Sequence, residues 1–255
     1  MLIIELGNCK GMEMDFFKRL VNRKEDQISK ERRASNRYNV SANYPLFIKV
    51  NGKKTEIRNL SLNGVNLTLD SDLKNQEKIK LNIGIKEQSY DIDAQVIFKE
   101  SQNYGIEILA NTNYDHFYHL ASPVVIGCSM KQYNTEDVAQ NDPHLIKKLY
   151  FGSTSSSIAA WYTKEKHPTF QSFEFEVEGC IIRGKENKLM FLSYTDKESL
   201  HENARLTHKL EMAPTKASAD QEQVLRSFLY WIVLHLNDHP KLQKDLLSFF
   251  PQNEN

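Results

Sequence analysis

The sequence predicts a mainly β fold followed by an α+β part: an N-terminal helix, a six-stranded antiparallel β-barrel, and a C-terminal α+β domain with a long C-terminal helix. Two observations carry this prediction. In the first half, apolar and polar residues alternate in six short runs separated by turn residues, which is typical of half-buried strands. In the second half, alternating runs give way to apolar residues at helical spacing after Pro214.

Composition excludes several classes of protein. The chain has 255 residues, of which 40% are hydrophobic and 26% charged, enough apolar material for a folded core in one or two domains. Lys plus Arg and Asp plus Glu both number 33, so no global field attracts DNA or an acidic membrane. The longest apolar stretch, 228–236, is less than half of the ~20 residues that a membrane span needs. The start lacks a basic secretory signal and the three cysteines lie far apart, so we expect a cytoplasmic protein with no DNA partner and no membrane span.

The first thirty residues, 1–30, are interpreted as a segment of their own that begins with a short apolar run. Phe17, Leu20 and Val21 then follow at helical spacing, ahead of a charged run. This pattern predicts a helix over 12–30 that is packed at its start and solvated at its end.

Residues 31–125 are predicted to form the barrel, because six short antiparallel strands joined by tight turns suit a small closed barrel. Asn51-Gly52 is the strongest hairpin signal, since both residues tolerate the positive φ angles of a two-residue turn. The predicted strands cover 46–50, 54–58, 65–69, 79–83, 92–98 and 104–109.

After the barrel, a short helix is predicted over 114–120, ending before Pro123. The stretch 126–143 is largely polar and unperiodic toward its end, and we interpret it as a linker between domains. The remainder, 144–255, is predicted to be an α+β domain of unknown role.

Within this second domain, Phe173, Phe175 and Val177 alternate with glutamates, so one strand face should be buried and the other charged. A turn is expected over 185–188. The predicted strands are 158–162, 170–180, 181–182 and 189–194.

The end of the chain carries the helical pattern. Ser218 with Gln221 three residues later is a capping-box signal for the start of a long helix, and a second helix is predicted over 241–250. The run 228–234 is more apolar than a half-exposed helix needs. The long helix is therefore either buried all round or in contact with a partner.

Three arginines, Arg32, Arg33 and Arg37, lie between the N-terminal helix and the first strand. A guanidinium is a rigid planar fork that binds a phosphate, or the O6/N7 edge of guanine, with two hydrogen bonds. Several guanidinium groups on one segment can therefore hold both the base and the phosphate of a guanine nucleotide. Taken alone, an arginine-rich junction is more often a solvated surface.

A second motif, Asn59-x-Ser61-x-x-Gly64, leads directly into a predicted strand. Asn and Ser two positions apart on a strand point to the same face and offer neutral donors and acceptors. Gly64 lets the backbone come close to a flat ligand or adopt a positive φ. Alone this motif is a common turn, but its combination with the arginines beside a six-strand pattern is much more specific.

These residues resemble the PilZ domain family, bacterial receptors for the second messenger cyclic di-GMP. The family pattern is Arg-x-x-x-Arg followed later by Asp/Asn-x-Ser-x-x-Gly, and all five positions are filled here. The run 104–108 also resembles the closing strand of these barrels. The resemblance covers about residues 30–125 and does not extend to the C-terminal half.

The resemblance implies a receptor that takes cyclic di-GMP as its ligand, uses no further cofactor and is not an enzyme. The arginines would bind guanine and phosphate, and the strand motif would lie against the other guanine. Ordering of the arginine segment would change the arrangement of the domains and relay the signal, with a protein partner expected at the C-terminal domain. The implied ligand-binding residues are Arg32, Arg33, Arg37, Asn59, Ser61 and Gly64.

Two rival functions stay open at this point. The barrel can be a structural or protein-docking module that binds no nucleotide, or the second half can be an unrecognised enzyme gated by the barrel. His235 and His239 have the spacing of metal ligands on a helix, but no motif places a third ligand, so we expect no metal site.

Overall fold

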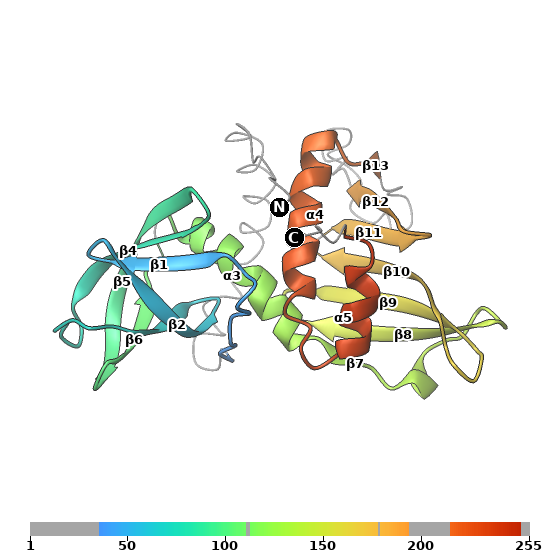
Figure 1. Ribbon diagram of the computed structural model, residues 1–255, viewed down its shortest axis with the longest axis horizontal. Coiled ribbons are helices and arrows are strands. Elements are labelled where there is room, and N and C mark those ends of the chain that lie inside the picture. The colour runs from blue at the N-terminus through green and yellow to red at the C-terminus, as the bar shows by residue number, and fades with distance from the viewer. Residues whose placement is uncertain (1–35, 111–112, 178, 194–214, 251–255) are drawn as a thin grey trace, which may run out of the picture. The chain divides into compact units, whose positions relative to one another are not determined.

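Figure 1 shows the computed structural model, which describes residues 36–110, 113–177, 179–193 and 215–250. The segment 1–30, with its predicted helix, lies outside the described residues. The described part falls into two compact units. One comprises the residues up to 128 together with 231–237, and the other comprises 129–230 and the residues from 238 on.

The first unit contains a closed antiparallel barrel with the strand order β1-β2-β3-β6-β5-β4, drawn in blue and green in Figure 1. Pairing of β1 with β4 closes it. Each strand coincides with one predicted from the alternation, so the predicted six-stranded barrel is confirmed. The strands are β1 Leu46–Val50, β2 Lys53–Ser61, β3 Gly64–Thr68, β4 Lys78–Ile85, β5 Gln88–Glu100 and β6 Asn103–Ile108.

The interior of the barrel follows from that alternation. Ile48, Leu67 and Ile92 point inward and are fully buried, which supplies the apolar burial that stabilises a barrel of this size. Between β1 and β2 the chain turns at Asn51 and Gly52, whose φ angles are 51° and 78°. The Asn-Gly hairpin is therefore confirmed in its turn geometry as well as its position.

Helix α3, Tyr114–Ser129, follows the barrel and packs its buried face into the same core. The sequence predicts an end before Pro123, and that prediction is wrong, because the helix continues through the proline. Proline removes one intrahelical hydrogen bond, but Pro123 is itself buried, and apolar burial offsets the loss. Ser122 also donates a hydrogen bond of 2.6 Å to the carbonyl of Tyr118 inside the disrupted turn.

The segment 231–237, at the end of helix α4 (Ala219–Val233), belongs to the barrel unit. The ring of Trp231 packs against the barrel core and meets the ring of Tyr44 edge-on, with centroids 5.6 Å apart. Val233 is fully buried. The end of the apolar run is therefore core, whereas Phe228 and Tyr230 earlier in the run are half-buried.

His235 fixes the same segment by hydrogen bonds. It is fully buried, and burial lowers its pKa, so the ring is neutral. Its Nε2 accepts a hydrogen bond from the backbone N–H of Ser41 at 3.1 Å. The proton then resides on Nδ1, which donates to the carbonyl of Trp231 at 2.7 Å.

The second unit is built on a seven-stranded antiparallel sheet in which the strands follow one another in chain order from β7 to β13. The predicted strand 170–180 is too long, because β10 ends at Val177 and Gly179 turns the chain with a φ of 85°. The strands are β7 Lys131–Gln132, β8 Leu145–Gly152, β9 Ser156–Thr163, β10 Phe170–Val177, β11 Cys180–Lys185, β12 Lys188–Ser193 and β13 Thr215–Lys216.

Strand β8 was not predicted from the sequence, because two lysines interrupt its apolar pattern. Lys147 and Lys148 nevertheless lie in the strand, and their ammonium groups sit over the rings of Trp161 and Tyr162 at 5.5 and 5.2 Å. A lysine stem can cover an aromatic ring while its charge stays near water. The stretch 126–143, interpreted from the sequence as a linker, holds the end of α3, strand β7 and the short helix η1 (Thr135–Asp137).

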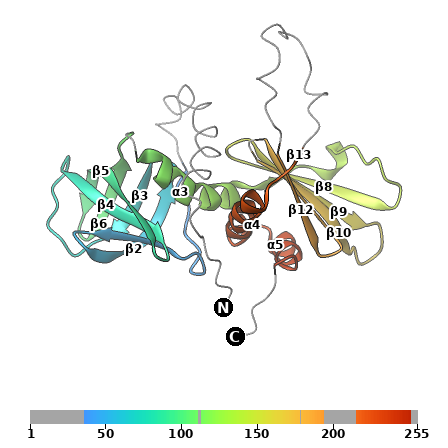
Figure 2. The same cartoon turned by 90° about the horizontal axis from the view of Figure 1, so that it is seen from above.

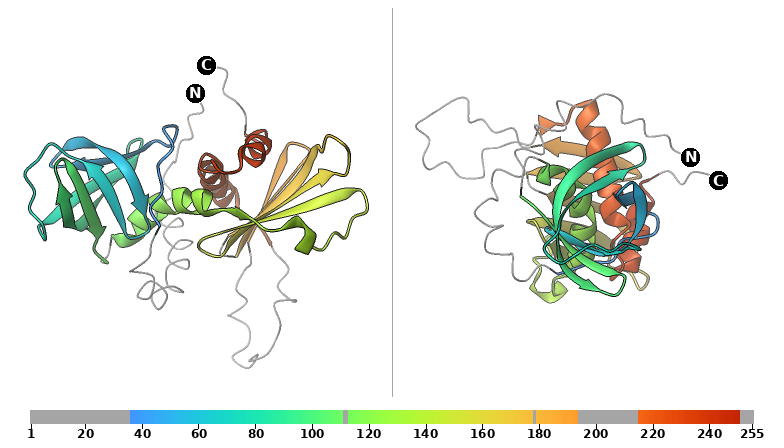
Figure 3. Two further views of the ribbon diagram at one scale, coloured as in Figure 1. Left: turned by 90° about the horizontal axis from the view of Figure 1, so that it is seen from below. Right: turned by 90° about the vertical axis from the view of Figure 1, so that its left-hand side faces the viewer.

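Helices α4 and α5 (Pro240–Leu247) cover one face of this sheet, as Figures 2 and 3 show. Helix α4 starts with the predicted capping box: Ser218 N–H donates to Gln221 at 3.0 Å, and Gln221 N–H donates back to the Ser218 hydroxyl at 3.4 Å. Arg226 lies over the ring of Phe191, 5.2 Å away. Among the described residues, no helix combines the length and the apolar character that crossing a bilayer requires.

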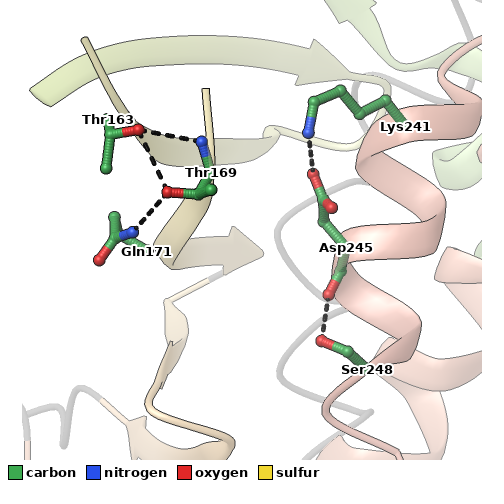
Figure 4. Close-up of polar contacts among 6 residues, drawn as sticks. All are labelled: Thr163, Thr169, Gln171, Lys241, Asp245 and Ser248. Atoms are coloured by element: carbon green, nitrogen blue, oxygen red, sulfur yellow. Dashed lines mark hydrogen bonds and ion pairs between the residues drawn. The ribbon is translucent and has the colours of Figure 1, made fainter. Parts of the chain in front are cut away.

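Figure 4 shows two groups of polar contacts, one within α5 and one at the end of the β9–β10 hairpin. Lys241 pairs with Asp245 at 3.1 Å, one turn apart. The same Lys241 ammonium lies 4.6 Å from the centre of the Tyr162 ring on β9. At the hairpin end, the hydroxyls of Thr163 and Thr169 lie 3.1 Å apart. The Lys241–Tyr162 contact joins the helix to the sheet, and none of these contacts bears on the predicted ligand site.

Candidate ligand-binding site

A backbone bridge joins Tyr38, the residue after Arg37, to the strand motif. Tyr38 N–H donates to the carbonyl of Leu60 at 2.8 Å, and Leu60 N–H donates back to Tyr38 at 2.9 Å. Leu60 lies between Asn59 and Ser61 of the strand motif, and Arg37 directly precedes Tyr38. The bridge therefore brings Arg37 next to the strand motif.

The face on which Arg37 lies follows from the same bridge. Tyr38 packs against the barrel core and Leu60 is fully buried. Because successive residues of an extended chain point to opposite faces, Arg37 and Asn59 lie on the outer side. Arg37 is exposed, as a residue that binds an anion from solution must be. Arg32 and Arg33 lie outside the described residues, and their role stays a prediction.

The Ser61 hydroxyl serves the hairpin between β2 and β3. It is 3% exposed, donates to the carbonyl of Gly64 and accepts from the N–H of Asn63, both at 3.4 Å. A serine that bonds to the backbone two and three residues on is a local turn device. The hydroxyl therefore shapes the turn in this structure, and a direct contact with ligand stays a prediction.

Gly64 is required by close packing. Its φ lies outside the left-handed region that Gly52 and Gly179 occupy. A Cβ at position 64 would lie 2.5 Å from the carbonyl oxygen of Ile106 on the neighbouring strand β6. The sequence suggested either a positive φ or a close backbone approach at Gly64. Close approach is the reason that applies, and the approaching group is the backbone of β6 in the same barrel.

Asn59 has an unsatisfied acceptor. The residue is half-buried, and its Oδ1 is screened from water and has no hydrogen-bond partner among the residues that the structure describes. Just before it, β2 carries a bulge, because Ile57 pairs with Leu67 while Asn59 pairs with Asn66, so that Arg58 is an extra residue. A bulge re-aims the side chains around it. Arg58 is exposed beside the motif, and the period-two alternation does not predict the inserted residue.

His116, His119 and His239 have partners of other kinds. His116 stacks on the ring of Tyr90, with centroids 3.8 Å apart. Burial is the main cause that lowers the pKa of His119 to about 3, so this residue is neutral. His239 Nε2 lies 2.9 Å from the carbonyl of Met130. Across the described ranges, no group of three or more His, Cys, Asp or Glu residues is placed to hold a metal ion.

Comparison with known proteins identifies the first unit. Residues 31–118 match the family model of the PilZ domain, and the match coincides with the six-stranded barrel, so this stretch is a PilZ domain. The C-terminal half matches no family model. PilZ domains are, in general, binding modules of a cyclic di-GMP receptor family rather than enzymes.

Two further comparisons concern the whole chain. No curated protein matches it. Among solved structures, the crystal structure of an uncharacterized Legionella protein is similar at 14% sequence identity with a TM-score of 0.27, covering 31% of this chain and 84% of that one.

Proposed function

We propose that this protein is a cyclic di-GMP receptor that binds the dinucleotide with its arginine segment and the Asn59-x-Ser61-x-x-Gly64 strand motif. The observation that carries the proposal is the Tyr38–Leu60 bridge, with hydrogen bonds of 2.8 and 2.9 Å. This bridge lies directly after Arg37 and between Asn59 and Ser61, and so supports joint binding by the two motifs. The match to the PilZ family supplies the ligand class.

The proposed chemistry divides between charge and neutral hydrogen bonding. Arg37, with Arg32 and Arg33 before it, supplies planar forks for guanine O6/N7 and for the two phosphates. Asn59 supplies a neutral acceptor on the strand side. Since the formal net charge of the chain is zero, the affinity for a dianion must come from this local cluster.

We further propose that the signal leaves the barrel through the residues that follow Arg37. Asn39 accepts a hydrogen bond from the Cys128 thiol at 3.8 Å, and Ser41 donates to His235. These two contacts lie at the ends of α3 and α4, where the chain passes into the second unit. A shift of the arginine segment on binding would displace both contacts, and the covalent chain carries that displacement onward.

The second unit is proposed to meet a protein partner. Met190 on β12 and Phe151 on β8 are 53% and 49% exposed. Their strand neighbours Phe191 and Tyr150 are buried and contact Arg226 of α4 and His239 next to α5. By alternation, the two exposed side chains lie on the sheet face opposite the helices. Exposed apolar side chains on a sheet face suit a protein partner.

The test of ligand identity is a calorimetric titration of the full chain with cyclic di-GMP and, separately, with its adenine counterpart. We expect binding of the guanine dinucleotide and at least tenfold weaker binding of the adenine one, because adenine carries an N6 donor where the arginine fork needs an O6 acceptor. Equal affinities for the guanine and adenine dinucleotides would show that the protein recognises only the phosphates and not the base. Absence of binding to either would leave the barrel as a docking module without nucleotide.

The relay is tested by hydrogen exchange with and without cyclic di-GMP. We expect ligand-induced changes in residues 37–44 and, at a distance from the motif, in the backbone N–H groups of 231–236, because His235 joins the two segments. The N–H groups of β4 serve as the internal control. Changes confined to the arginine segment and residues 59–64 would contradict the relay while leaving the binding proposal intact.

A further inference from the structure

A row of residues crosses the outer face of the barrel at the level of Asn59. Asn59 on β2 pairs with Asn66 on β3, and Asn66 pairs with Gly105 on β6. Val65 and Leu67, on either side of Asn66, are fully buried. Since side chains alternate along a strand, Asn66 points outward on the same face as Asn59. Asn66 is not part of the motif that the sequence singled out.

Asn66 shares the unsatisfied state of its neighbour. The Oδ1 atoms of both asparagines are screened from water and accept no hydrogen bond from any residue that the structure describes. On the far side of Asn66, Gly105 offers no side chain and is covered by the ring of Phe98, so no polar group from β6 supplies the missing donor. Leaving a buried acceptor unpaired destabilises a fold. Two such acceptors on adjacent strands, beside a predicted ligand motif, are available to a donor from outside the described part of the barrel.

We infer that Asn66 is a further guanine-recognition residue, whose Oδ1, together with that of Asn59, accepts hydrogen bonds from the N1–H and N2–H groups of a guanine base. This inference rests on the proposed cyclic di-GMP function. Guanine presents these two donors side by side on its Watson–Crick edge, whereas adenine presents one donor and one acceptor there. A pair of acceptors therefore selects guanine, and the Hoogsteen edge stays available to arginine.

The test compares Asn66→Leu, which keeps the approximate size of the side chain and removes its polar atoms, with Thr68→Val as a matched control. Thr68 lies two positions along the same strand and also has a buried unsatisfied oxygen, but it pairs with Glu56 and Asn103, away from Asn59. Each variant is titrated with cyclic di-GMP and with the hypoxanthine analogue, which lacks the N2 amino group. Unfolding by urea is measured in parallel.

We expect Asn66→Leu to weaken cyclic di-GMP binding roughly two- to tenfold, the range for one neutral hydrogen bond, while its urea midpoint stays at or above the wild-type value. Thr68→Val should raise the midpoint and leave the affinity unchanged. The preference for guanine over hypoxanthine should fall in Asn66→Leu or in Asn59→Leu, depending on which oxygen accepts from N2–H. If Asn66→Leu does not fold, Asn66→Ala takes its place, because it adds no bulk.

The outcomes separate this inference from the function on which it rests. If wild type binds cyclic di-GMP and Arg37→Ala weakens it while Asn66→Leu binds as wild type does, the Asn66 inference is overturned and the receptor proposal survives. A guanine preference that persists in both asparagine variants also overturns the inference. If wild type binds no cyclic di-GMP, both proposals fall.

Discussion

Replacing Arg37 by alanine is expected to weaken cyclic di-GMP binding by about tenfold or more. Arg37 is exposed and lies one residue from the bridge to the strand motif, so it can bind ligand without any rearrangement of the barrel. Charge-assisted hydrogen bonds of this kind contribute about 1.5–3 kcal/mol. The measurement is calorimetric titration of the full chain with the dinucleotide.

Arg183→Ala is the matched control for this prediction. Arg183 is an exposed arginine of the second unit that pairs with Glu174 at 2.6 Å. An exposed pair of this kind contributes little to stability, so the variant should fold and bind as wild type does. The urea midpoint of Arg37→Ala should also match wild type, because the guanidinium lies in solvent. Equal loss of affinity in the two variants would point to a nonspecific charge effect and would contradict the assigned role of Arg37.

Gly64→Ala is expected to lower the free energy of unfolding by about 3 kcal/mol, the upper range for overpacking. The added methyl carbon would lie 2.5 Å from the Ile106 carbonyl oxygen, and this neighbour is backbone held in the β3–β6 ladder. Relief requires a shift of one strand against the other. Urea unfolding of the full chain measures the effect.

Gly52→Ala provides the comparison, because the two glycines are needed for different reasons. Gly52 has a φ of 78° and open space around its Cβ position, so alanine there costs only the strain of a left-handed residue, about 1 kcal/mol. The larger loss should therefore be found at position 64. A Gly64→Ala protein as stable as wild type but impaired in binding would show that this glycine makes room for ligand and not for β6.

Patterns local to the chain predicted most of the barrel. The Asn51-Gly52 turn and the alternation around Val65 and Leu67 depend on each residue and its next neighbours in the chain. The structure contains the turn and the strand that these patterns predict. The same holds for Ser218 and Gln221, whose reciprocal hydrogen bonds form as the capping signal predicts. Where a sequence pattern describes a contact within a few residues, tertiary packing does not override the local structure that the pattern predicts.

Features that depend on distant neighbours could not be predicted in this way. Pro123 is tolerated inside α3 because the surrounding turn is buried, and β8 forms because aromatic rings on β9 cover the stems of its lysines. The alternation does place Asn66 on the outer face. Its unsatisfied oxygen, however, follows from what β2 and β6 present on either side, and no local pattern carries that information.

The return of residues 231–237 to the barrel unit has a consequence for the order of folding. Strands β7 to β12 pair only with sequence neighbours, so each hairpin can close as soon as its second strand has been synthesised. The barrel strands are made earlier, yet Tyr44 and Ser41 obtain their cover from Trp231 and His235 only when most of the chain has left the ribosome. A fragment cut off after α3 would keep every strand of the barrel and still present an aromatic ring and an unpaired amide to water. The barrel unit is thus completed only after strands β7 to β12 of the second unit have been synthesised, which ties its maturation to the synthesis of that unit.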